Sequence, residues 1–342
     1  MRLLVEAGVA GGFGWRDVVV RHSYAPVPQL VAATATEEWY RGFNIVVLSR
    51  GMPTYFCKCR PAGDVVLERE TRLRTCLAGT RPDGLSVPPA RVASSNRIAV
   101  QVGPFLRGVH YGRIVIGQSP GAYVKTLRGI LGGAAELSGL ALRNCPGVRP
   151  HSPAILVSEA ASESLADVAR LDALEPDLLA ALTAAVRDAG EVPPIPQHGD
   201  FWWQNVLMAE DRYWAIDFDA FGDVQVPLYD DLTMMCTTLR LRPGTGETGF
   251  ERLLADRFEA LACRELLTER ASASGLAPSQ LDGVLVYHLA HMASTVNRRG
   301  GRIHGAPHVA AVRRAAELLA SGKRGLLSAD PSASHGGNQR AR

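Results

Sequence analysis

Hydrophobic residues follow two kinds of pattern along this chain. Over the first hundred positions they form short β-branched runs at 18–20, 43–48 and 55–59, with turn residues such as Gly51 and Pro53 between them. Runs of this kind are typical of antiparallel strands joined by a hairpin. From about position 119 the chain becomes rich in Ala and Leu, with the spacing of helices. The pattern therefore predicts a β-rich first part and an α-helical second part.

One helix is expected inside the β-rich part, over 65–77. Leu67, Leu73 and Leu77 give it an apolar side, and charged residues cover most of the remainder. Further extended segments are expected at 97–102 and 113–116. The helices expected in the second part lie at 123–142, 165–174, 177–189, 249–267, 278–297 and 307–321. Two short apolar segments at 195–207 and 213–218, joined by a turn, interrupt them.

The fold class predicted from these elements is α+β with two lobes. A stretch rich in Gly and Pro at 103–121 is the natural place for the boundary. We divide the chain into a first lobe at 1–105, a second lobe at 106–327 and a disordered tail at 328–342, which lacks large apolar residues.

Composition excludes several classes of protein. The 342 residues are 46% hydrophobic and 21% charged, which excludes wholesale disorder, and the net charge of +3 is too small for a chain built mainly to hold nucleic acid or an anionic membrane. No apolar run approaches the roughly 18 residues that span a bilayer, and the first residues lack a leader pattern, so a cytoplasmic protein is expected. The six cysteines lack zinc spacing; Cys57 and Cys59 share one strand face, either for packing or for a metal.

Asp200, Asn205 and Asp217 carry the candidate chemistry. Positions 198–205 read His-Gly-Asp-Phe-Trp-Trp-Gln-Asn, and Asp217 follows twelve positions after Asn205. An Asp before a strand, an Asn five residues later and an Asp at the far end of the hairpin bring two carboxylates and an amide oxygen together. One Asp and the Asn suit Mg²⁺ beside a nucleotide triphosphate, while the other Asp can orient an acceptor hydroxyl and take its proton.

This arrangement, most marked over 197–232, resembles the catalytic and metal-binding loops of the aminoglycoside phosphotransferase and choline kinase-like family. The resemblance implies a bilobal, protein kinase-like fold with a β-rich nucleotide-binding N-lobe and an α-helical C-lobe that holds the acceptor. It also implies that Asp200 is the catalytic base, that Asn205 and Asp217 bind Mg²⁺, and that His198 braces the loop.

In this fold class the N-lobe supplies a lysine for the nucleotide phosphates and a helical glutamate to hold it. Lys58 lies on the strand after the hairpin and is the candidate lysine. Glu70 is its candidate partner, with Glu68 on a different helix face as the second choice. A solvated strand lysine is the alternative interpretation of Lys58.

The resemblance also places the nucleotide between the lobes. Gly42 and Asn44 belong to the short loop that would cover the phosphates, since glycine lets the backbone come close to phosphate oxygens. The adenine is expected to bond backbone groups of the lobe connection around 101–103, which includes Gln101 and Val102.

Several neighbouring residues keep two interpretations. Trp202 and Trp203 either form a stacking wall for a ring-containing acceptor or pack in the core. Asp219 and Asp223 are either further carboxylates of the site or exposed loop acids. Asp231 is expected to cap the helix that follows.

The function predicted is transfer of the γ-phosphoryl group of ATP, with GTP possible, to a hydroxyl of an aminoglycoside-like or sugar-like small molecule, with Mg²⁺. Two alternatives remain: a catalytically silent kinase-like nucleotide-binding protein, and a nucleotidyl (AMP) transferase on the same fold. No nucleic acid or membrane partner is expected. The sequence does not distinguish the acceptor, ATP from GTP, or the oligomeric state.

Overall fold

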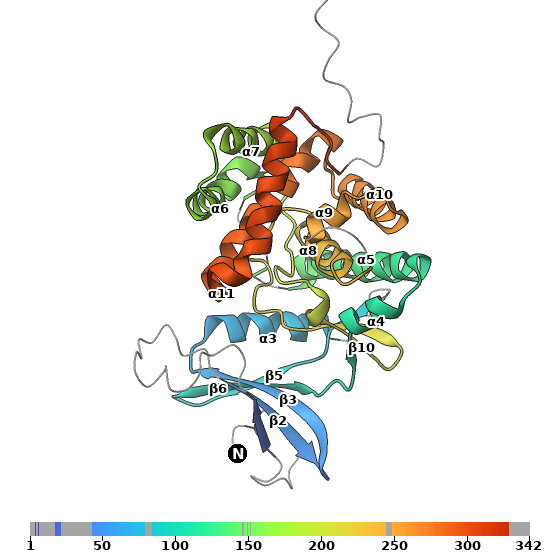
Figure 1. Ribbon diagram of the computed structural model, residues 1–342. Helices are drawn as coiled ribbons and strands as arrows, with labels where there is room; N and C mark the ends of the chain where they lie inside the picture. The colour runs from blue at the N-terminus through green and yellow to red at the C-terminus, as the bar shows by residue number, and fades with distance from the viewer. Residues whose placement is uncertain are drawn as a thin grey trace, which may run out of the picture.

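A computed structural model describes residues 4, 6, 18–21, 43–78, 84–145, 147–148, 150, 152–243 and 248–327, with the backbone alone described at 18–21, 43 and 299–305. A β-sheet forms one end of the molecule and a group of helices forms the other (Figure 1). Helix α3 (Val65–Leu77) lies along the sheet on the side that faces the helices. This is the two-lobed α+β arrangement that the hydrophobic pattern predicts.

Within the described part of the chain, the main sheet has five strands in the order β1-β2-β3-β6-β5, each antiparallel to its neighbours. They are β1 (Val18–Arg21), β2 (Phe43–Ser49), β3 (Met52–Pro61), β5 (Arg91–Ser94) and β6 (Ile98–Pro104). The register places Asn44 of β2 and Gln101 of β6 directly opposite Lys58 of β3. Side chains that face each other across strands share one face, so these three polar groups form a row.

The opposite face of the sheet is apolar. Cys57 and Cys59 flank Lys58 along β3, and their thiols are buried in a small cluster that includes Val100 and Val102. The structure therefore supports packing as the role of the two cysteines.

Helix α3 joins the sheet to the helical lobe. It begins where the Asp64 carboxylate accepts a hydrogen bond from the Leu67 backbone N–H at 2.8 Å, which satisfies one of the unpaired donors of the first turn. Its buried Leu73 and Leu77 belong to the large hydrophobic core of the helical lobe and not to the small cluster under the sheet. The helix is therefore held by both lobes, through Arg74 and Glu70 on the side of the sheet and through Leu73 and Leu77 on the side of the helices.

The second lobe contains eight labelled helices of the described residues and two small sheets, one of which includes a strand from the first lobe. Its helices are α4 (Tyr111–Gly117), α5 (Pro120–Asn144), α6 (Val157–Asp172), α7 (Pro176–Ala189), α8 (Tyr229–Leu239), α9 (Gly249–Leu253), α10 (Phe258–Ala273) and α11 (Leu281–Ala320), with 3-10 turns η3 (Trp203–Asn205) and η4 (Pro278–Gln280). One sheet joins β4 (Leu85–Ser86), β11 (Arg212–Ala215), β10 (Val206–Ala209) and β7 (Val109–His110) in that order, and the other pairs β8 (Ile155–Leu156) with β9 (Glu191–Val192). The β10–β11 hairpin is the interruption that the sequence predicts.

Two expected elements are wrong. The segment 113–116 is part of helix α4 and not a strand, because Tyr111 and Val115, one turn apart, are buried together in the core. The single helix expected over 249–267 is two helices, α9 and α10, and the capping box of Thr248 and Glu251 starts the first of them.

Helix α11 does not run straight. A straight helix of its 40 residues would be about 60 Å long. Yet Asp282, at its start, accepts hydrogen bonds from the backbone N–H groups of Gly325 and Leu326, both at 2.7 Å, a few residues beyond its end. The two ends of α11 therefore lie side by side.

The two arms of α11 pack on the same neighbour. Arg298 from the first arm and Arg313 from the second both reach carboxylates of α6. Pro307 lies inside the helix between them, and proline is a common cause of sharp bends. The two helices expected at 278–297 and 307–321 thus occur as the two arms of one bent helix.

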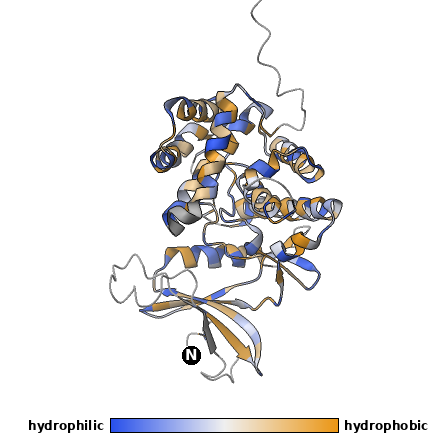
Figure 2. Ribbon diagram, viewed as in Figure 1, coloured by the Kyte–Doolittle hydropathy of each residue, from blue (hydrophilic) through white to orange (hydrophobic). Residues whose placement is uncertain are grey.

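The helices carry hydrophobic and hydrophilic residues on different sides (Figure 2). None of the helices in the described ranges combines the length and the apolar composition needed to cross a membrane.

Candidate active site

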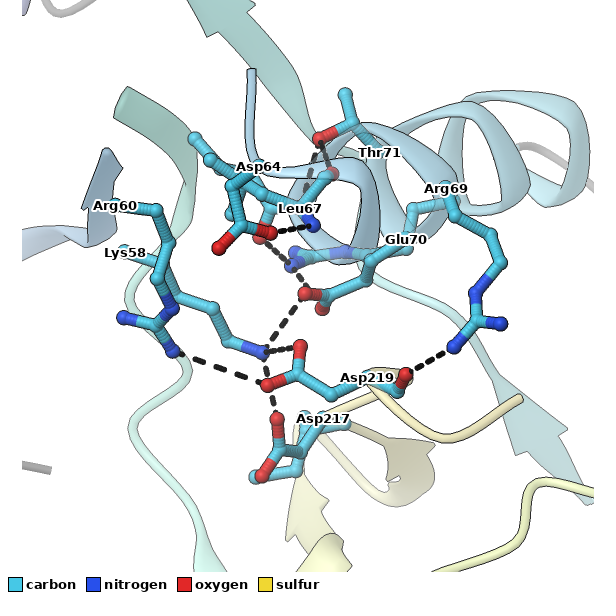
Figure 3. A network of polar contacts seen from close by, with 12 residues as sticks. Lys58, Arg60, Asp64, Leu67, Arg69, Glu70, Thr71, Asp217 and Asp219 are labelled. Carbon is cyan, nitrogen blue, oxygen red and sulfur yellow. Dashed lines mark hydrogen bonds and ion pairs between the residues drawn. The ribbon is translucent and has the colours of Figure 1, made fainter. Parts of the chain in front are cut away.

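The ammonium group of Lys58 lies at the centre of a cluster of carboxylates between the lobes. It donates to Glu70 Oε2 at 2.8 Å, to Asp217 Oδ1 at 2.6 Å and to Asp219 Oδ1 at 2.9 Å (Figure 3). Lys58 and Glu70 come from the first lobe, and the two aspartates come from the loop after β11 in the second. The interpretation of Lys58 as a solvated lysine is wrong, because the residue is only 6% exposed.

The carboxylates keep Lys58 charged. Burial alone would lower the pKa of the Lys58 ammonium, but the nearby Glu70, Asp217 and Asp219 outweigh burial and raise that pKa. Burial would raise the pKa of Asp219, yet the attraction of Lys58 brings it down to about 2. Both groups are therefore ionised at neutral pH.

A second buried cation supports Glu70 from behind. Arg74, one turn further along α3, donates to Glu70 Oε1 at 3.3 Å and to Gln101 Oε1 at 2.9 Å. Gln101 in turn donates to Thr71 Oγ1 at 2.8 Å. Burial raises the pKa of Glu70, and the charges of Lys58 and Arg74 oppose that rise. The network holds Glu70 in one position facing Lys58.

Asp200 and Asn205 lie in one short loop ahead of β10. The Asn205 amide nitrogen donates to the Asp200 backbone oxygen at 2.8 Å and to Asp200 Oδ2 at 3.2 Å. The Asn205 backbone oxygen accepts from the N–H of Ile216 at 3.0 Å, which places Asn205 beside Asp217. Because the amide nitrogen is used on Asp200, the amide oxygen of Asn205 is the atom that a cation would meet.

The loop that carries Asp200 is braced by His198 and Asp230. His198 Nε2 donates to the Ile216 backbone oxygen at 3.0 Å, and burial lowers the pKa of His198 to about 4, so the ring is neutral. Asp230, at the start of α8, accepts from the backbone N–H groups of His198 at 2.6 Å and Gly199 at 3.0 Å. Burial raises the pKa of Asp230 to about 7, even though these two hydrogen bonds favour its charged form.

The donors that could hold a metal are oxygen atoms. Ligand atoms of Glu70, Asp217 and Asp219 all lie within 4.8 Å of one another. Glu70 is buried and engaged by two cations, whereas the side chains of Asp217 and Asp219 are 31% and 39% exposed. Carboxylate and amide oxygens of this kind fit Mg²⁺, which prefers hard oxygen donors.

The residues expected to contact the nucleotide differ in where they fall in the structure. Gly42 lies outside the described residues. Asn44 lies on β2 next to Lys58, and its side-chain oxygen is buried without a hydrogen bond.

The range 101–103 is not the lobe connection, which begins at Phe105 after the end of β6. Gln101 and Val102 are paired with β3 on one side and β5 on the other, so the sheet uses their backbone groups. Gly103 is paired with β3 but not with β5, so the β5-facing edge of β6 is unpaired with any described strand from Gly103 onward.

The two tryptophans after Asp200 differ in their packing. A methyl carbon added at Gly112 of α4 would lie 2.3 Å from the ring of Trp203, so this ring is pressed against α4. Trp202 is half-buried, and its ring centroid is 5.5 Å from that of Trp203. Packing therefore accounts for Trp203, which lies against the large core, whereas Trp202 is half-buried without belonging to that core.

Asp231 does not cap α8. The helix begins at Tyr229, and the Asp231 carboxylate accepts from Arg270 Nε at 2.8 Å. Sequence reasoning chose Asp231 and missed the bracing role of its neighbour Asp230. It also missed Arg74, although the spacing of four residues from Glu70 on a helix was a usable signal.

A buried lysine–glutamate pair on a β-rich lobe, facing an Asp-Asn-Asp set on a helical lobe, defines a phosphotransferase with a protein kinase-like fold. The comparison of sequences agrees. The chain belongs to the phosphotransferase enzyme family, whose model matches residues 43–267. That range contains Lys58, Glu70, Asp200, Asn205 and Asp217. None of the curated proteins matches the chain in sequence.

Solved structures of similar fold come from small-molecule kinases. A glucosamine kinase shares 14% identity with a TM-score of 0.51, over 89% of this chain and 80% of that one. Macrolide 2'-phosphotransferase MphH from Brachybacterium faecium shares 16% identity with a TM-score of 0.51, over 83% of this chain and 96% of that one. Glucosamine kinase in complex with glucosamine, ADP and inorganic phosphate shares 14% identity with a TM-score of 0.50, over 78% and 77% of the two chains. At these identities the likeness confirms the fold alone.

Proposed function

We propose that the protein transfers the γ-phosphoryl group of ATP, or of GTP, to a hydroxyl of a small molecule. The observation that carries the proposal is the contact of Lys58 with both Glu70 and Asp217, because it joins the phosphate-binding half of the site to the metal-binding half. Asp200 lies in the adjoining loop, tied to Asn205. A silent nucleotide-binding protein would have no need of this full set.

Each residue of the set has one task. Lys58, kept charged by its neighbours, would neutralise phosphate oxygens while Glu70 holds it in place. Asn205 and Asp217, with Asp219 beside them, would hold Mg²⁺, which when bound offsets charge on the phosphates. Asp200 would orient the acceptor hydroxyl for in-line attack and accept its proton as the new bond to phosphorus forms.

The acceptor class rests on two supports. The similar fold of proteins named for glucosamine and macrolide substrates favours an acceptor with sugar hydroxyls. The half-buried ring of Trp202, two positions after Asp200, offers an apolar face on which a sugar ring could stack. We therefore propose a sugar-like or aminoglycoside-like acceptor.

The test is a mass-spectrometric transfer assay with Mg²⁺ and ATP or GTP against amino sugars, aminoglycosides, macrolides and amino alcohols. We expect a product about 80 Da heavier than its acceptor. In Asp200→Asn transfer should fall by about 100-fold or more, with nucleotide binding kept, because general-base contributions are of that size. Asp211→Asn, in the exposed turn of the β10–β11 hairpin, is the matched control.

Two results would contradict the proposal. A product heavier by an adenylyl group would show the alternative nucleotidyl transfer. Full phosphoryl transfer by Asp200→Asn would reject the assignment of the base.

A further inference from the structure

A second contact between the lobes lies next to the Lys58 cluster. Arg69 of α3 donates to both carboxylate oxygens of Asp223, at 2.5 and 3.1 Å, and to the backbone oxygen of Asp219 at 2.6 Å. Figure 3 shows its guanidinium reaching the chain at Asp219 from the opposite side to Lys58. Arg69 precedes Glu70 in sequence, so one turn of α3 contacts both Lys58 and the loop.

The loop held by Arg69 is irregular between β11 and α8. Its later half is fixed by backbone hydrogen bonds to the segment before the catalytic loop, such as Gly222 N–H to the Gln197 oxygen at 2.8 Å. Its earlier half has less backbone support, and Asp217 adopts a left-handed φ of 63° that is unfavourable for a residue with a side chain. Contacts from outside the loop are needed to hold that half in place.

Three side chains of the first lobe supply such contacts. Arg60 lies 3.8 Å from Asp219 Oδ2, which is too far for a hydrogen bond. The close ties are therefore those of Lys58 and Arg69, and they use different groups of the loop. The tie through Lys58 uses the ammonium and the Asp217 carboxylate, both of which a metal-bound nucleotide would recruit. The tie through Arg69 uses Asp223 and a backbone oxygen, which take no part in the proposed chemistry. The planar guanidinium suits this bidentate contact in a way that lysine would not.

We propose that Arg69 is a positioning residue that keeps the loop 217–223 against α3 when the nucleotide phosphates draw Lys58 away from Asp217. The inference rests on the proposed function. It means that the metal-binding carboxylates keep their place relative to Glu70 throughout the reaction.

The experiment compares Arg69→Met, which keeps most of the aliphatic stem, with Arg72→Met, an exposed arginine on the same helix. Calorimetry would measure the affinity for ATP with Mg²⁺ and with chelator. We expect Arg69→Met to weaken binding by about three- to tenfold with Mg²⁺, the size typical of a partly exposed charged pair with extra hydrogen bonds, and to leave metal-free binding unchanged. Arg72→Met should match the wild type in both conditions.

A charge exchange separates positioning from general destabilisation. Arg69→Asp and Asp223→Arg should each weaken metal-dependent binding, and the double variant should recover at least half of the loss. An equal loss with and without Mg²⁺, or no loss in Arg69→Met, would overturn the role of Arg69. If the wild type itself shows no metal-dependent nucleotide binding, the proposed function is rejected, and the role of Arg69 is rejected with it.

Discussion

The Lys58 ammonium lies where three carboxylates converge, so it acts as a cation already built into the site. A divalent ion that approaches Asp217 and Asp219 without a nucleotide must compete with this charge. Coulomb interactions at a few ångströms in a partly buried site are worth several kcal/mol, enough to decide whether an ion binds.

We therefore predict that Lys58→Met binds Mn²⁺ in the absence of nucleotide at least about tenfold more tightly than the wild type. Electron paramagnetic resonance titration measures free and bound Mn²⁺ directly. Lys58→Arg keeps the charge and is the control. Equal affinities for the wild type and Lys58→Met would show that the ammonium does not compete with the ion.

Asp230 makes stability depend on pH. Its pKa in the folded protein is about 7 against an ordinary 3.8, so the folded state binds more protons than the unfolded state between those values. The stability linked to its proton is complete below pH 4 and is lost as the pH rises to about 7, by an amount on the order of a few kcal/mol.

Asp230→Asn removes the titrating carboxyl group, so the variant lacks the contribution to stability that is lost as the pH rises. We predict that the free energy of unfolding of Asp230→Asn, minus that of the wild type, increases as the pH rises from 4 to 7. The lowered pKa of His198 acts in the opposite direction, but it is present in both proteins and cancels in the difference. Urea denaturation at several pH values measures this difference in the free energy of unfolding. A difference that stays constant between pH 4 and 7 would contradict the raised pKa of Asp230.

Local spacing in the sequence predicts part of the candidate site. Asp200, Asn205 and Asp217 flank the β10–β11 hairpin, so strand geometry predicts that they meet, and the structure brings Asn205 against Asp200 and bonds its backbone to Ile216, beside Asp217. Asp230 could not be assigned in this way, because its role depends on contact with the backbone of His198, which is 32 positions away in sequence. Hydrophobic spacing carries no information about such partners.

At the scale of elements, α4 is fitted closely to the loop that carries Asp200 and Asn205. The ring of Trp203 occupies the space that a side chain at Gly112 would need. The end of the same helix is open, since a methyl group at Gly117 would meet nothing within 4 Å.

We predict that Gly112→Ala lowers the free energy of unfolding by about 1 to 3 kcal/mol, as overpacking commonly does, and also slows phosphoryl transfer because Trp203 precedes Asn205 in the loop. Gly117→Ala is the matched control and should have little effect. Thermal unfolding and the transfer assay measure the two quantities. A Gly112→Ala protein with wild-type stability would mean that the ring has room to move.

Element boundaries were predictable where a capping residue and a clear period coincide, as at Asp64 before α3. The misread segment 113–116 is too short for its period to separate strand from helix. Helix α11 is the reverse case, because the two helical ranges expected at 278–297 and 307–321 are the two arms of one helix in which the helical hydrogen bonding continues.

At the scale of the whole molecule, Asp282 closes the bent helix. Its carboxylate satisfies two backbone N–H groups, of Gly325 and Leu326. We predict that Asp282→Ala costs about 1 to 3 kcal/mol of stability, the penalty for buried donors left without acceptors. Hydrogen exchange at these two amides should accelerate beyond the change in global stability. Asp188→Ala, exposed on α7, is the control, and an equal effect of both variants would contradict the closing role.

The large hydrophobic core extends across the boundary between the lobes. Leu73 and Leu77 of α3 are buried with helices of the second lobe, so packing crosses the boundary that we draw between 105 and 106. The boundary between 105 and 106 remains a prediction. The packing of Leu73 and Leu77 joins α3 to helices of the second lobe.

The two halves of the site are far apart in sequence, so the ribosome makes them at different times. Lys58 and its partner Asp217 are 159 residues apart, so at the usual pace of translation the ribosome makes the second roughly 10 to 30 seconds after the first. Helix α5, which packs on α3, ends at Asn144, so the apolar side of α3 lacks this cover during the first part of that interval. The nascent chain would therefore benefit most from a chaperone while only the N-lobe has been synthesised.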